Sequence, residues 1–268
     1  MEHKLPTLGF IGTGTLASAL VTGFCARAPE TPYPIVLSPR SRDNAARLKA
    51  AWPDRITVAE SMQEVVDRSD WVMLAVLPKA GEEVCASLRF RPEQKVVNFM
   101  SDKALPRIRE WIGPTAALVH MVPLTFNAFC DGPIVLSPPN AEAAEIFGHI
   151  GQVVQLEERY HAAVLAAITG CVAPFFTLLD TLSQWSAAQG VPPDLAARYV
   201  SGFFGAVCQE AAHLDAAGLS RMAGTATPGG INFLVKDLLA QQGGFQMWAD
   251  AMEPALERLT ANIPRPEK

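Results

Sequence analysis

A glycine motif near the N-terminus is the segment best suited to bind a phosphate-bearing ligand. Gly12, Gly14 and Ala17 form a G-x-G-x-x-A pattern between the apolar run Thr7–Ile11 and the helix-like segment Leu16–Ala26. In this setting the first glycine permits a tight turn, the second lets the backbone approach a pyrophosphate, and the alanine keeps helix and sheet close. The free N–H groups at the helix start attract phosphate. The motif predicts a dinucleotide site, and a glycine turn without a ligand is the alternative.

The residues after the second apolar run distinguish between the two nicotinamide cofactors. NAD-binding proteins usually place an acidic residue at the end of this strand, where it binds the ribose hydroxyls. Here the run Ile35–Ser38 is followed by Arg40, Ser41 and Arg42, with no acid at the strand end. Guanidinium and hydroxyl groups suit a 2′-phosphate, which arginine binds through planar, charge-assisted hydrogen bonds. The sequence therefore favours NADP(H), and a solvated basic turn is the alternative.

A third segment, Ala75–Lys79, ends the continuous apolar run Trp71–Val76. Ligands of open α/β sheets bind at the carboxyl edge of the strands. Val76 and Pro78 are therefore expected to pack near the adenine or the ribose–nicotinamide part of the cofactor. A proline that only ends a strand explains this segment equally well.

The elements that must position these residues alternate along the first part of the chain. Short apolar runs separated by helix-like segments are typical of a parallel sheet covered on both faces. The expected strands are Thr7–Ile11, Ile35–Ser38, Trp71–Val76, Lys95–Met100, Ala116–Val122, Pro133–Ser137 and Val153–Leu156, and the expected helices between the first three are Leu16–Ala26 and Asp43–Ala51.

After about residue 157 the pattern changes to Ala- and Leu-rich helical segments with almost no strand signal. A chain of 268 residues also exceeds the usual size of one hydrophobic core. We therefore expect an α/β fold with a Rossmann-type, doubly wound parallel sheet over residues 1–157 and an all-α substrate and dimerisation domain over residues 158–268. Apolar faces around Phe175–Leu182 and Tyr199–Val207 are expected to form a two-fold interface, which predicts a homodimer or higher homo-oligomer.

Composition argues against several other classes of function. The net charge is −5 and no basic block is present, so a nucleic-acid partner is not expected. The five cysteines are scattered without a CxxC pair, which predicts reduced thiols in a cytoplasmic protein and neither a metal site nor a disulfide framework. No uninterrupted apolar stretch approaches the roughly 20 residues that cross a bilayer, so no membrane partner is expected.

Several of these landmarks, taken in order, resemble the pyrroline-5-carboxylate reductase family. Val76-Leu77-Pro78 stands where that family carries Val-Lys-Pro, and His120-Met121-Val122-Pro123 is similar to its Arg-x-Met-Pro-Asn stretch. The segment from Ala226 to Asn232, Ala-Thr-Pro-Gly-Gly-Ile-Asn, resembles its Ser-Pro-Gly-Gly-x-Thr loop. The resemblance covers nearly the whole chain. It implies an NADPH-dependent reductase of a C=N bond that converts L-pyrroline-5-carboxylate to L-proline, as in proline biosynthesis.

The resemblance also implies roles for the residues of the Pro-Gly-Gly loop. In that family the loop holds the substrate carboxylate through backbone N–H groups, and a glycine turn that leads into a helix is a good anion site on physical grounds. Thr227, Gly229 and Gly230 are therefore expected to bind the carboxylate, and Thr227 and Asn232 to act in catalysis. Asn232 replaces a family threonine beside the imine nitrogen. It can hydrogen-bond there but is a poor acid, so the proton would come from water or from an imine already protonated. A helix start without a ligand is the alternative.

The glycine motif, the basic turn and the resemblance together predict one set of cofactor contacts. These are Gly12, Thr13, Gly14, Thr15, Leu16, Ser38, Arg40, Ser41, Arg42, Val76, Leu77, Pro78 and Pro123.

The chain departs from the family's pattern where cofactor and substrate would meet. Leu124 replaces an asparagine, Ser101–Lys103 replaces Ala-Ala-Gly, and Cys171 and Phe175 make the pocket more apolar. Two alternatives therefore stay open: a Rossmann reductase or dehydrogenase for another imine, keto or hydroxy acid, and a non-catalytic NADP-binding protein. Dehydrogenases of hydroxy acids with this architecture resemble one another in a catalytic lysine on the first interdomain helix. Residues 159–189 contain no lysine, which counts against a hydroxy acid. A structural role is expected for His120.

Overall fold

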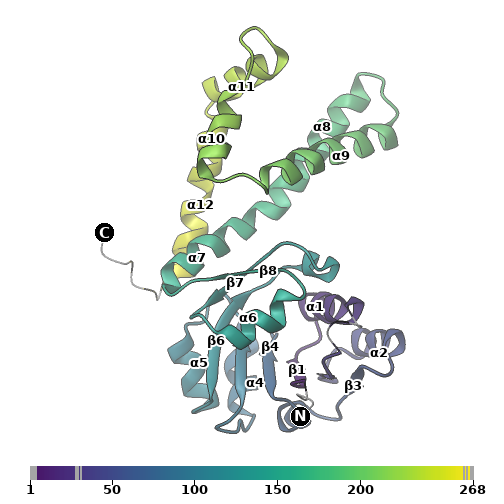
Figure 1. Ribbon diagram of the computed structural model, residues 1–268, viewed down its shortest axis with the longest axis vertical. Coiled ribbons are helices and arrows are strands. Elements are labelled where there is room, and N and C mark those ends of the chain that lie inside the picture. Colours follow the sequence, from purple (N-terminus) through teal and green to yellow (C-terminus); the bar gives the residue numbers. More distant parts are fainter. Residues whose placement is uncertain (1–4, 28–29, 31, 262, 264, 266–268) are drawn as a thin grey trace. The chain divides into compact units, whose positions relative to one another are not determined.

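The computed structural model describes residues 5–27, 30, 32–261, 263 and 265. Contacts within the chain define two compact units (Figure 1). The first comprises residues 1–166 together with 256–268, and the second comprises residues 167–255. The first unit holds the β-sheet, and the second is helical.

The first unit is built on an eight-stranded sheet with the order β3-β2-β1-β4-β5-β6-β7-β8. The strands are β1 Leu8–Ile11, β2 Ile35–Leu37, β3 Ile56–Val58, β4 Trp71–Leu74, β5 Lys95–Asn98, β6 Ala117–Val122, β7 Pro133–Ser137 and β8 Gln152–Gln155. The expected parallel sheet is confirmed from β1 to β6, whereas β7 runs antiparallel to β6 with His120 opposite Ser137. The strand β3 was not anticipated, because it is only three residues long and two of them are half-exposed.

Helices connect the strands and then continue alone. They are α1 Thr15–Ala26, α2 Arg42–Ala51, α3 Met62–Arg68, α4 Gly81–Ala86, α5 Leu105–Ile112, α6 Ala141–Gly148, α7 Arg159–Ile168, α8 Val172–Ala188, α9 Pro193–Ala211, α10 Ala216–Gly224, α11 Ile231–Gln241 and α12 Gly244–Thr260. Three short 3-10 helices complete the described structure: η1 Pro78–Ala80, η2 Thr125–Phe129 and η3 Thr169–Cys171.

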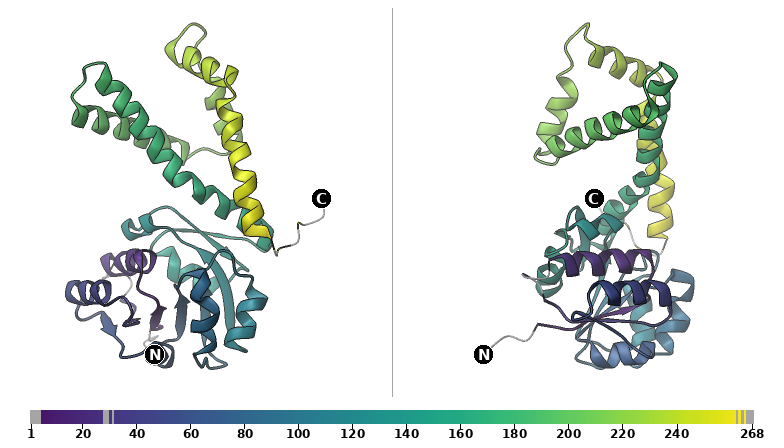
Figure 2. Two further views of the ribbon diagram at one scale, coloured as in Figure 1. Left: turned by 180° about the vertical axis from the view of Figure 1, so that it is seen from behind. Right: turned by 90° about the vertical axis from the view of Figure 1, so that its right-hand side faces the viewer.

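Both faces of the sheet are covered, which explains why the central strands are apolar without alternation. Phe10 packs in one buried cluster with side chains of α1, α2 and α6, whereas its neighbour Ile11 packs in another with α3, α4 and α5. The same division separates Trp71 and Met73 from Val72 and Leu74 in β4. Figure 2 shows the first unit from two further sides, with helices in front of and behind the strands. The carboxyl ends of β1, β2, β4, β5 and β6 consequently form one continuous edge.

The helical run Arg159–Ala188 is long and apolar enough to cross a membrane by length and composition. The expectation that no such stretch exists is therefore wrong for this segment, where no Asp, Glu, Lys or Arg occurs between Arg159 and Asp180. Core helices of soluble proteins meet the same criterion. Within the second unit, α8 packs against α9, with the rings of Phe175 and Phe204 edge to face at 6.2 Å.

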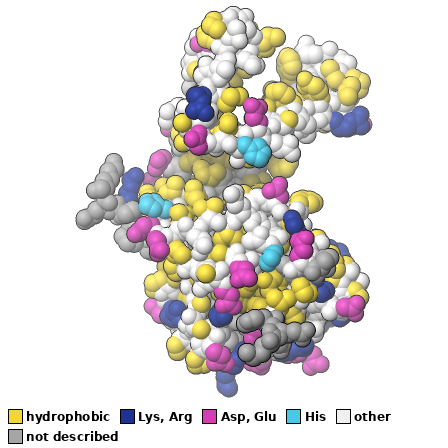
Figure 3. All heavy atoms as spheres, in the orientation of Figure 1, with side chains coloured by type: hydrophobic (Ala, Val, Ile, Leu, Met, Phe, Trp, Pro, Cys, Tyr) yellow, Lys and Arg dark blue, Asp and Glu magenta, His cyan; other side chains and the backbone are white. Residues whose placement is uncertain are grey.

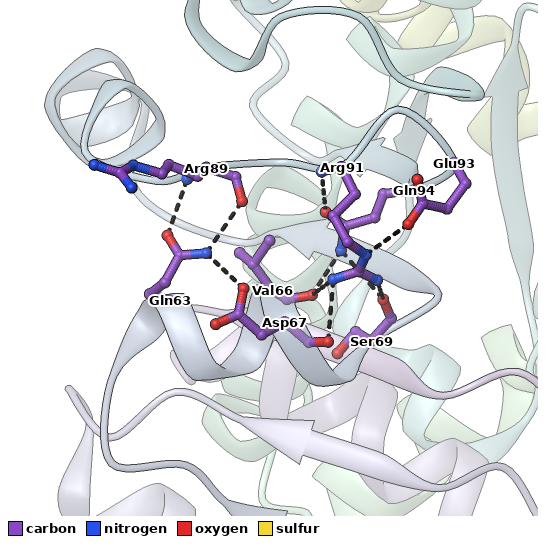
Figure 4. Close-up of polar contacts among 8 residues, drawn as sticks. All are labelled: Gln63, Val66, Asp67, Ser69, Arg89, Arg91, Glu93 and Gln94. Atoms are coloured by element: carbon purple, nitrogen blue, oxygen red, sulfur yellow. Dashed lines mark hydrogen bonds and ion pairs between the residues drawn. The ribbon is translucent and has the colours of Figure 1, made fainter.

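At the opposite edge of the sheet, one arginine holds the end of α3 (Figure 4). The Arg91 guanidinium donates hydrogen bonds to the carbonyl oxygens of Val66, Asp67 and Ser69, each at 3.0 Å. The buried Gln94 amide donates to the carbonyls of Val66 and Ser69 as well. A helix leaves its last carbonyls unpaired, and a cation near them is favourable. This contact therefore anchors a helix of only seven residues beside β4.

We predict that Arg91→Ala lowers the free energy of unfolding by about 1–2 kcal/mol, because three carbonyls lose a charged donor on a partly solvated side chain. Arg89→Ala is the matched control, since the Arg89 side chain points away from this cluster in Figure 4. Urea unfolding of the two variants measures the difference. A change in Arg91→Ala within about 0.5 kcal/mol, as for an ordinary surface position, would contradict the anchoring role.

Candidate cofactor and substrate sites

The glycine turn after β1 is held against the end of β4. Gly12 has φ +98°, a backbone conformation that residues other than glycine rarely adopt. A Cβ atom at this position would lie 2.6 Å from the carbonyl oxygen of Ala75 and 3.3 Å from a methyl carbon of Val76. The turn is therefore restricted to glycine by both its backbone angle and its neighbours. Val76 thus lies directly beside the turn.

Three polar contacts join this turn to the end of β2 and the start of α2. The Gly12 N–H donates to Ser38 Oγ at 2.9 Å, and Thr13 Oγ1 donates to the carbonyl of Ser38 at 3.2 Å. The Asn44 amide donates to the carbonyl of Thr13 at 2.9 Å. The structure thus brings the predicted residues of the glycine turn and the basic turn together. Asn44 was missed from the sequence, where only its place three residues after Ser41 hinted at a contact near a helix start.

The helices that begin at these two turns start without a capping side chain among the described residues. Gly14 precedes α1 and Ser41 precedes α2, and neither helix start receives a side-chain hydrogen bond. In contrast, α3, α6 and α10 are capped by Ser61, Asn140 and Asp215. The first N–H groups of α1 and α2 therefore stay available to an anion, in line with the positive end of the helix dipole.

The remaining predicted cofactor residues lie along the same edge of the sheet. Thr15 and the half-buried Leu16 open α1, and Arg40 and Arg42 are exposed and make no ion pair with any described residue. Leu77, 66% exposed, and Pro78 follow β4 at the start of η1. Pro123 is buried immediately after β6.

A buried polar network lies at the ends of β5 and β6. The side chain of Asn98 accepts a hydrogen bond from the Met100 N–H at 3.0 Å and donates to the Met100 carbonyl at 3.1 Å. Its amide nitrogen also lies 3.2 Å from Nδ1 of His120. Burial and, to a smaller extent, the nearby Arg159 guanidinium lower the pKa of His120 to about 3, so the imidazole is neutral at neutral pH. Asn98 thereby shapes the segment after β5 where the chain departs from the family pattern.

The predicted substrate loop lies in the second unit, before α11. Gly229 has φ +78°, and the N–H of Gly230 donates to the carbonyl of Thr227 at 2.9 Å. Because that N–H is already used, the open donors are those of Ile231 and Asn232 at the uncapped start of α11. Asn232 is exposed in the first turn of this helix. The open N–H groups of this loop therefore lie one or two residues later than expected for Gly230.

Two further findings bear on the alternatives. The Nζ of Lys236 donates to the carbonyl of Ala223 at 2.6 Å, so this lysine holds the end of α10. This hydrogen bond counts against a hydroxy-acid dehydrogenase, in which Lys236 would be a candidate for the catalytic base. Within the described part of the chain, no group of three His, Cys, Asp or Glu side chains is placed to hold a metal ion.

Comparison with known proteins supports the resemblance. Residues 7–101 match the family model described as NADP oxidoreductase, coenzyme F420-dependent. The chain is 28% identical to the pyrroline-5-carboxylate reductase of Glycine max over 198 residues, which cover 70% of this chain and 71% of that one. It is 24% identical to the pyrroline-5-carboxylate reductase of Escherichia coli over 96% of this chain and 97% of that one. The fold is similar to a Plasmodium falciparum pyrroline carboxylate reductase solved with NADP bound, with a TM-score of 0.82 at 18% identity, covering 97% and 98% of the two chains. The expected fold, a Rossmann-type domain followed by a helical domain, is confirmed.

We predict opposite outcomes for alanine at the two glycines of the turn. Gly12→Ala places a methyl group against the Ala75 carbonyl at a positive φ, so it should lower the melting temperature clearly. At Gly14, φ is −76° and no atom lies within 4 Å of the new methyl group, so the Gly14→Ala protein should fold like the wild type. The methyl group at Gly14 would nevertheless block a pyrophosphate, weakening NADPH binding tenfold or more, about 1.4 kcal/mol.

Thermal unfolding and NADPH fluorescence titration of both variants test this pair. Unchanged NADPH affinity in a stable Gly14→Ala protein would show that the turn does not receive the pyrophosphate.

Proposed function

We propose that this chain, a divergent member of the pyrroline-5-carboxylate reductase family, reduces L-pyrroline-5-carboxylate to L-proline with NADPH. The observation that carries the proposal is a pair of glycine turns, Gly12–Gly14 and Gly229–Gly230, each followed by a helix whose N-terminus is uncapped. One turn suits the phosphates of a dinucleotide, and the other suits the carboxylate of a small substrate. The relatives from Glycine max and Escherichia coli carry the name of this activity.

The cofactor in this proposal is NADP(H), which supplies a hydride when bound. Thr13, Gly14, Thr15 and Leu16 would hold the pyrophosphate at the start of α1. The 2′-phosphate would lie at the start of α2, where Arg40 and Arg42 are exposed and the Ser41 hydroxyl makes no capping bond. The related Plasmodium falciparum structure was solved with NADP. Val76, Leu77, Pro78 and Pro123 would line the path toward the nicotinamide along the carboxyl edge.

The substrate loop would act by orienting the substrate. Its open N–H groups would fix the carboxylate, and the Thr227 hydroxyl would add a donor. The Asn232 amide would hold the imine nitrogen by a hydrogen bond but cannot supply a proton at neutral pH. The proton therefore comes from water or arrives on the imine itself. Rate enhancement would rest on holding the reacting carbon in place, which can contribute several kcal/mol.

One observation favours a second candidate, reduction of a less polar cyclic imine. The segment that is Ser- and Gly-rich in the family is apolar here. Cys171 Sγ lies 3.8 Å from Met252 Sδ, and Phe175 packs edge-on against Phe204. A pocket lined by sulfur and aromatic groups would favour a more apolar ring over the small pyrroline.

The helical unit supports the proposal of a cytoplasmic homodimer. Large apolar side chains on α8, α9, α11 and α12 are strongly exposed, as Figure 3 shows for one face. These include Phe176 (66%), Trp185, Tyr199 (72%), Ile231 and Met247. An exposed apolar surface of this extent marks an interaction site, and a second copy in two-fold symmetry is the commonest solution. The apolar run Arg159–Ala188 then belongs to an interface rather than to a bilayer, and neither a membrane nor a nucleic acid is needed as a partner.

We predict that the purified protein oxidises NADPH in the presence of L-pyrroline-5-carboxylate, and that Asn232→Ala lowers kcat/KM by at least tenfold without weakening NADPH binding. Nicotinamide absorbance follows the reaction. NADPH binding without turnover on this substrate would sink the first proposal, and turnover on larger cyclic imines would then establish the second candidate.

The double substitution Arg40→Ala with Arg42→Ala should raise the Kd for NADPH roughly 100-fold or more, since charge-assisted contacts to the 2′-phosphate contribute about 1.5–3 kcal/mol each. The Kd for NADH should change little. Arg89→Ala, which removes an exposed arginine elsewhere on the first unit, serves as the control. Equal weakening of both cofactors would exclude these arginines as 2′-phosphate ligands.

Light scattering should give a mass of at least twice the 28.8 kDa of one chain. Phe176→Asp should lower this mass to that of a monomer, because it places a charge on the proposed interface. Phe129→Asp is the matched control, since Phe129 is 84% exposed on η2 of the first unit. A wild-type monomer, or equal effects of the two substitutions, would contradict the proposed interface.

A further inference from the structure

A second group of polar side chains lies on the α5 face of the sheet, within the first unit. Leu118 belongs to the buried cluster of this face, and Val119 and Met121 belong to the opposite one. Since side chains alternate along a strand, His120 points to the same face as Leu118. Ser137 lies directly opposite His120 in the antiparallel register of β6 and β7, so it shares that face.

The imidazole of His120 carries a hydrogen-bond donor with no partner among the described residues. The Asn98 carboxamide accepts from the Met100 N–H through its oxygen, so its nitrogen is the donor toward Nδ1 of His120. In the neutral ring, Nδ1 is therefore the acceptor, and the proton is assigned to Nε2 by this network. The side chain is 0% exposed, and its Nε2 makes no hydrogen bond. A buried donor left in this way is costly.

Arg159 at the start of α7 presents a second open donor on the same side. Its Nη2 donates to the Ser101 carbonyl at 3.2 Å, while its Nε is buried and has no partner in the described structure. No described carboxylate lies within ion-pair distance of it. Burial lowers the pKa of this guanidinium to about 10, as expected for a cation that gains no compensating anion. The effect of Arg159 on the pKa of His120 places the two groups in mutual electrostatic range.

A cavity of about 280 Å³ is lined by Arg159, whereas His120 is not among its lining residues. Arg159 and Ser137 form its polar side, and aliphatic groups form most of the rest: Ala104, Leu105, Pro106, Pro138 and Ile263. Glu157 also lines it, at more than ion-pair distance from Arg159. Asp102 lines an adjoining small cavity, and its carboxylate pairs with Lys103 at 3.3 Å. The positive guanidinium thus faces an apolar space too small for a drug-sized ligand and suited to a smaller one.

We propose that this cavity binds a small carboxylic acid with an aliphatic or saturated-ring body, whose carboxylate pairs with the Arg159 guanidinium. A guanidinium without a carboxylate partner matches the two oxygens of a carboxylate. The aliphatic lining accommodates the rest of the molecule. Because the same guanidinium holds the Ser101 carbonyl, an occupant would also steady the segment after β5. This site is made only of residues in the first unit and is separate from the proposed substrate loop at Gly229.

Calorimetric titration with cyclopentanecarboxylate, acetate and uncharged cyclopentanecarboxamide at equal ionic strength tests the site. A carboxylate could also bind the substrate loop, so the titrations use the full chain carrying Gly229→Ala, which strains that loop. We expect cyclopentanecarboxylate to bind more tightly than acetate, and the carboxamide not to bind. Arg159→Met should weaken binding of the carboxylate at least tenfold, while Arg107→Met, at a solvent-exposed arginine, should not.

Ala104→Leu provides a second test that leaves Arg159 in place and fills the cavity. It should abolish carboxylate binding while NADPH binding reports an intact first unit. Retained binding in Ala104→Leu or in a folded Arg159→Met protein would overturn the proposal, as would equal binding of the carboxamide. Carboxylate binding that is present in the wild-type chain but absent in the Gly229→Ala chain would instead assign the acid to the substrate loop and overturn the separate site. Each of these results is independent of whether the chain reduces pyrroline-5-carboxylate.

Discussion

The approach of the Gly12 backbone to the Ala75 carbonyl is the constraint on which the proposed cofactor site depends. The 2.6 Å separation from a would-be Cβ leaves no room for a side chain, so β1 can turn into α1 directly beside the end of β4. This position aims the N-terminus of α1 along the carboxyl edge. The hydrogen bonds of Ser38 and Asn44 then bring the basic turn to the same place. A looser turn would separate the phosphate donors from the arginines, and neither could then select NADP over NAD.

The chain uses its positive groups in two different physical settings. Arg40 and Arg42 are solvated, so each gains little until a phosphate replaces the surrounding water. They can therefore remain unpaired without cost to the fold. Arg159 is partly buried without a carboxylate partner, and such a charge is unfavourable unless something compensates it. The exposed pair suits a ligand that binds reversibly. The buried guanidinium, in contrast, is stabilised only when an anion or another acceptor compensates its charge. The uncompensated charge of Arg159 therefore indicates a ligand, although no sequence motif identifies this site.

The sequence predicted those features that are encoded locally. Gly12, Gly14 and Arg40 could be interpreted because a strand-to-helix turn and the residue at the end of the second strand have fixed chemical meanings. The continuous apolar runs of β1 and β4 followed from burial on both faces. The reversed direction of β7 could not be inferred, since an apolar run carries no sign of its direction. Asn44, Asn98 and Arg159 were not identified, because their partners lie tens of residues away and are brought near only by tertiary folding. The return of residues 256–268 to the first unit likewise depends on packing rather than on local pattern.

The order of the substrate loop depends on how the helices of the second unit are packed, which the loop's own residues do not indicate. Among the described residues of α8 to α12, very few side chains are buried, and those on α11 are all exposed. A helix of this kind gains most of its stability from packing of its apolar face, not from propensity. Ile231, 81% exposed, lies beside Asn232 at the start of that helix. In the proposed dimer, the second copy would cover such faces and hold the uncapped N-terminus of α11 in place. Ordering of the carboxylate donors would then be linked to association, because the free energy that fixes the loop would come from the interface.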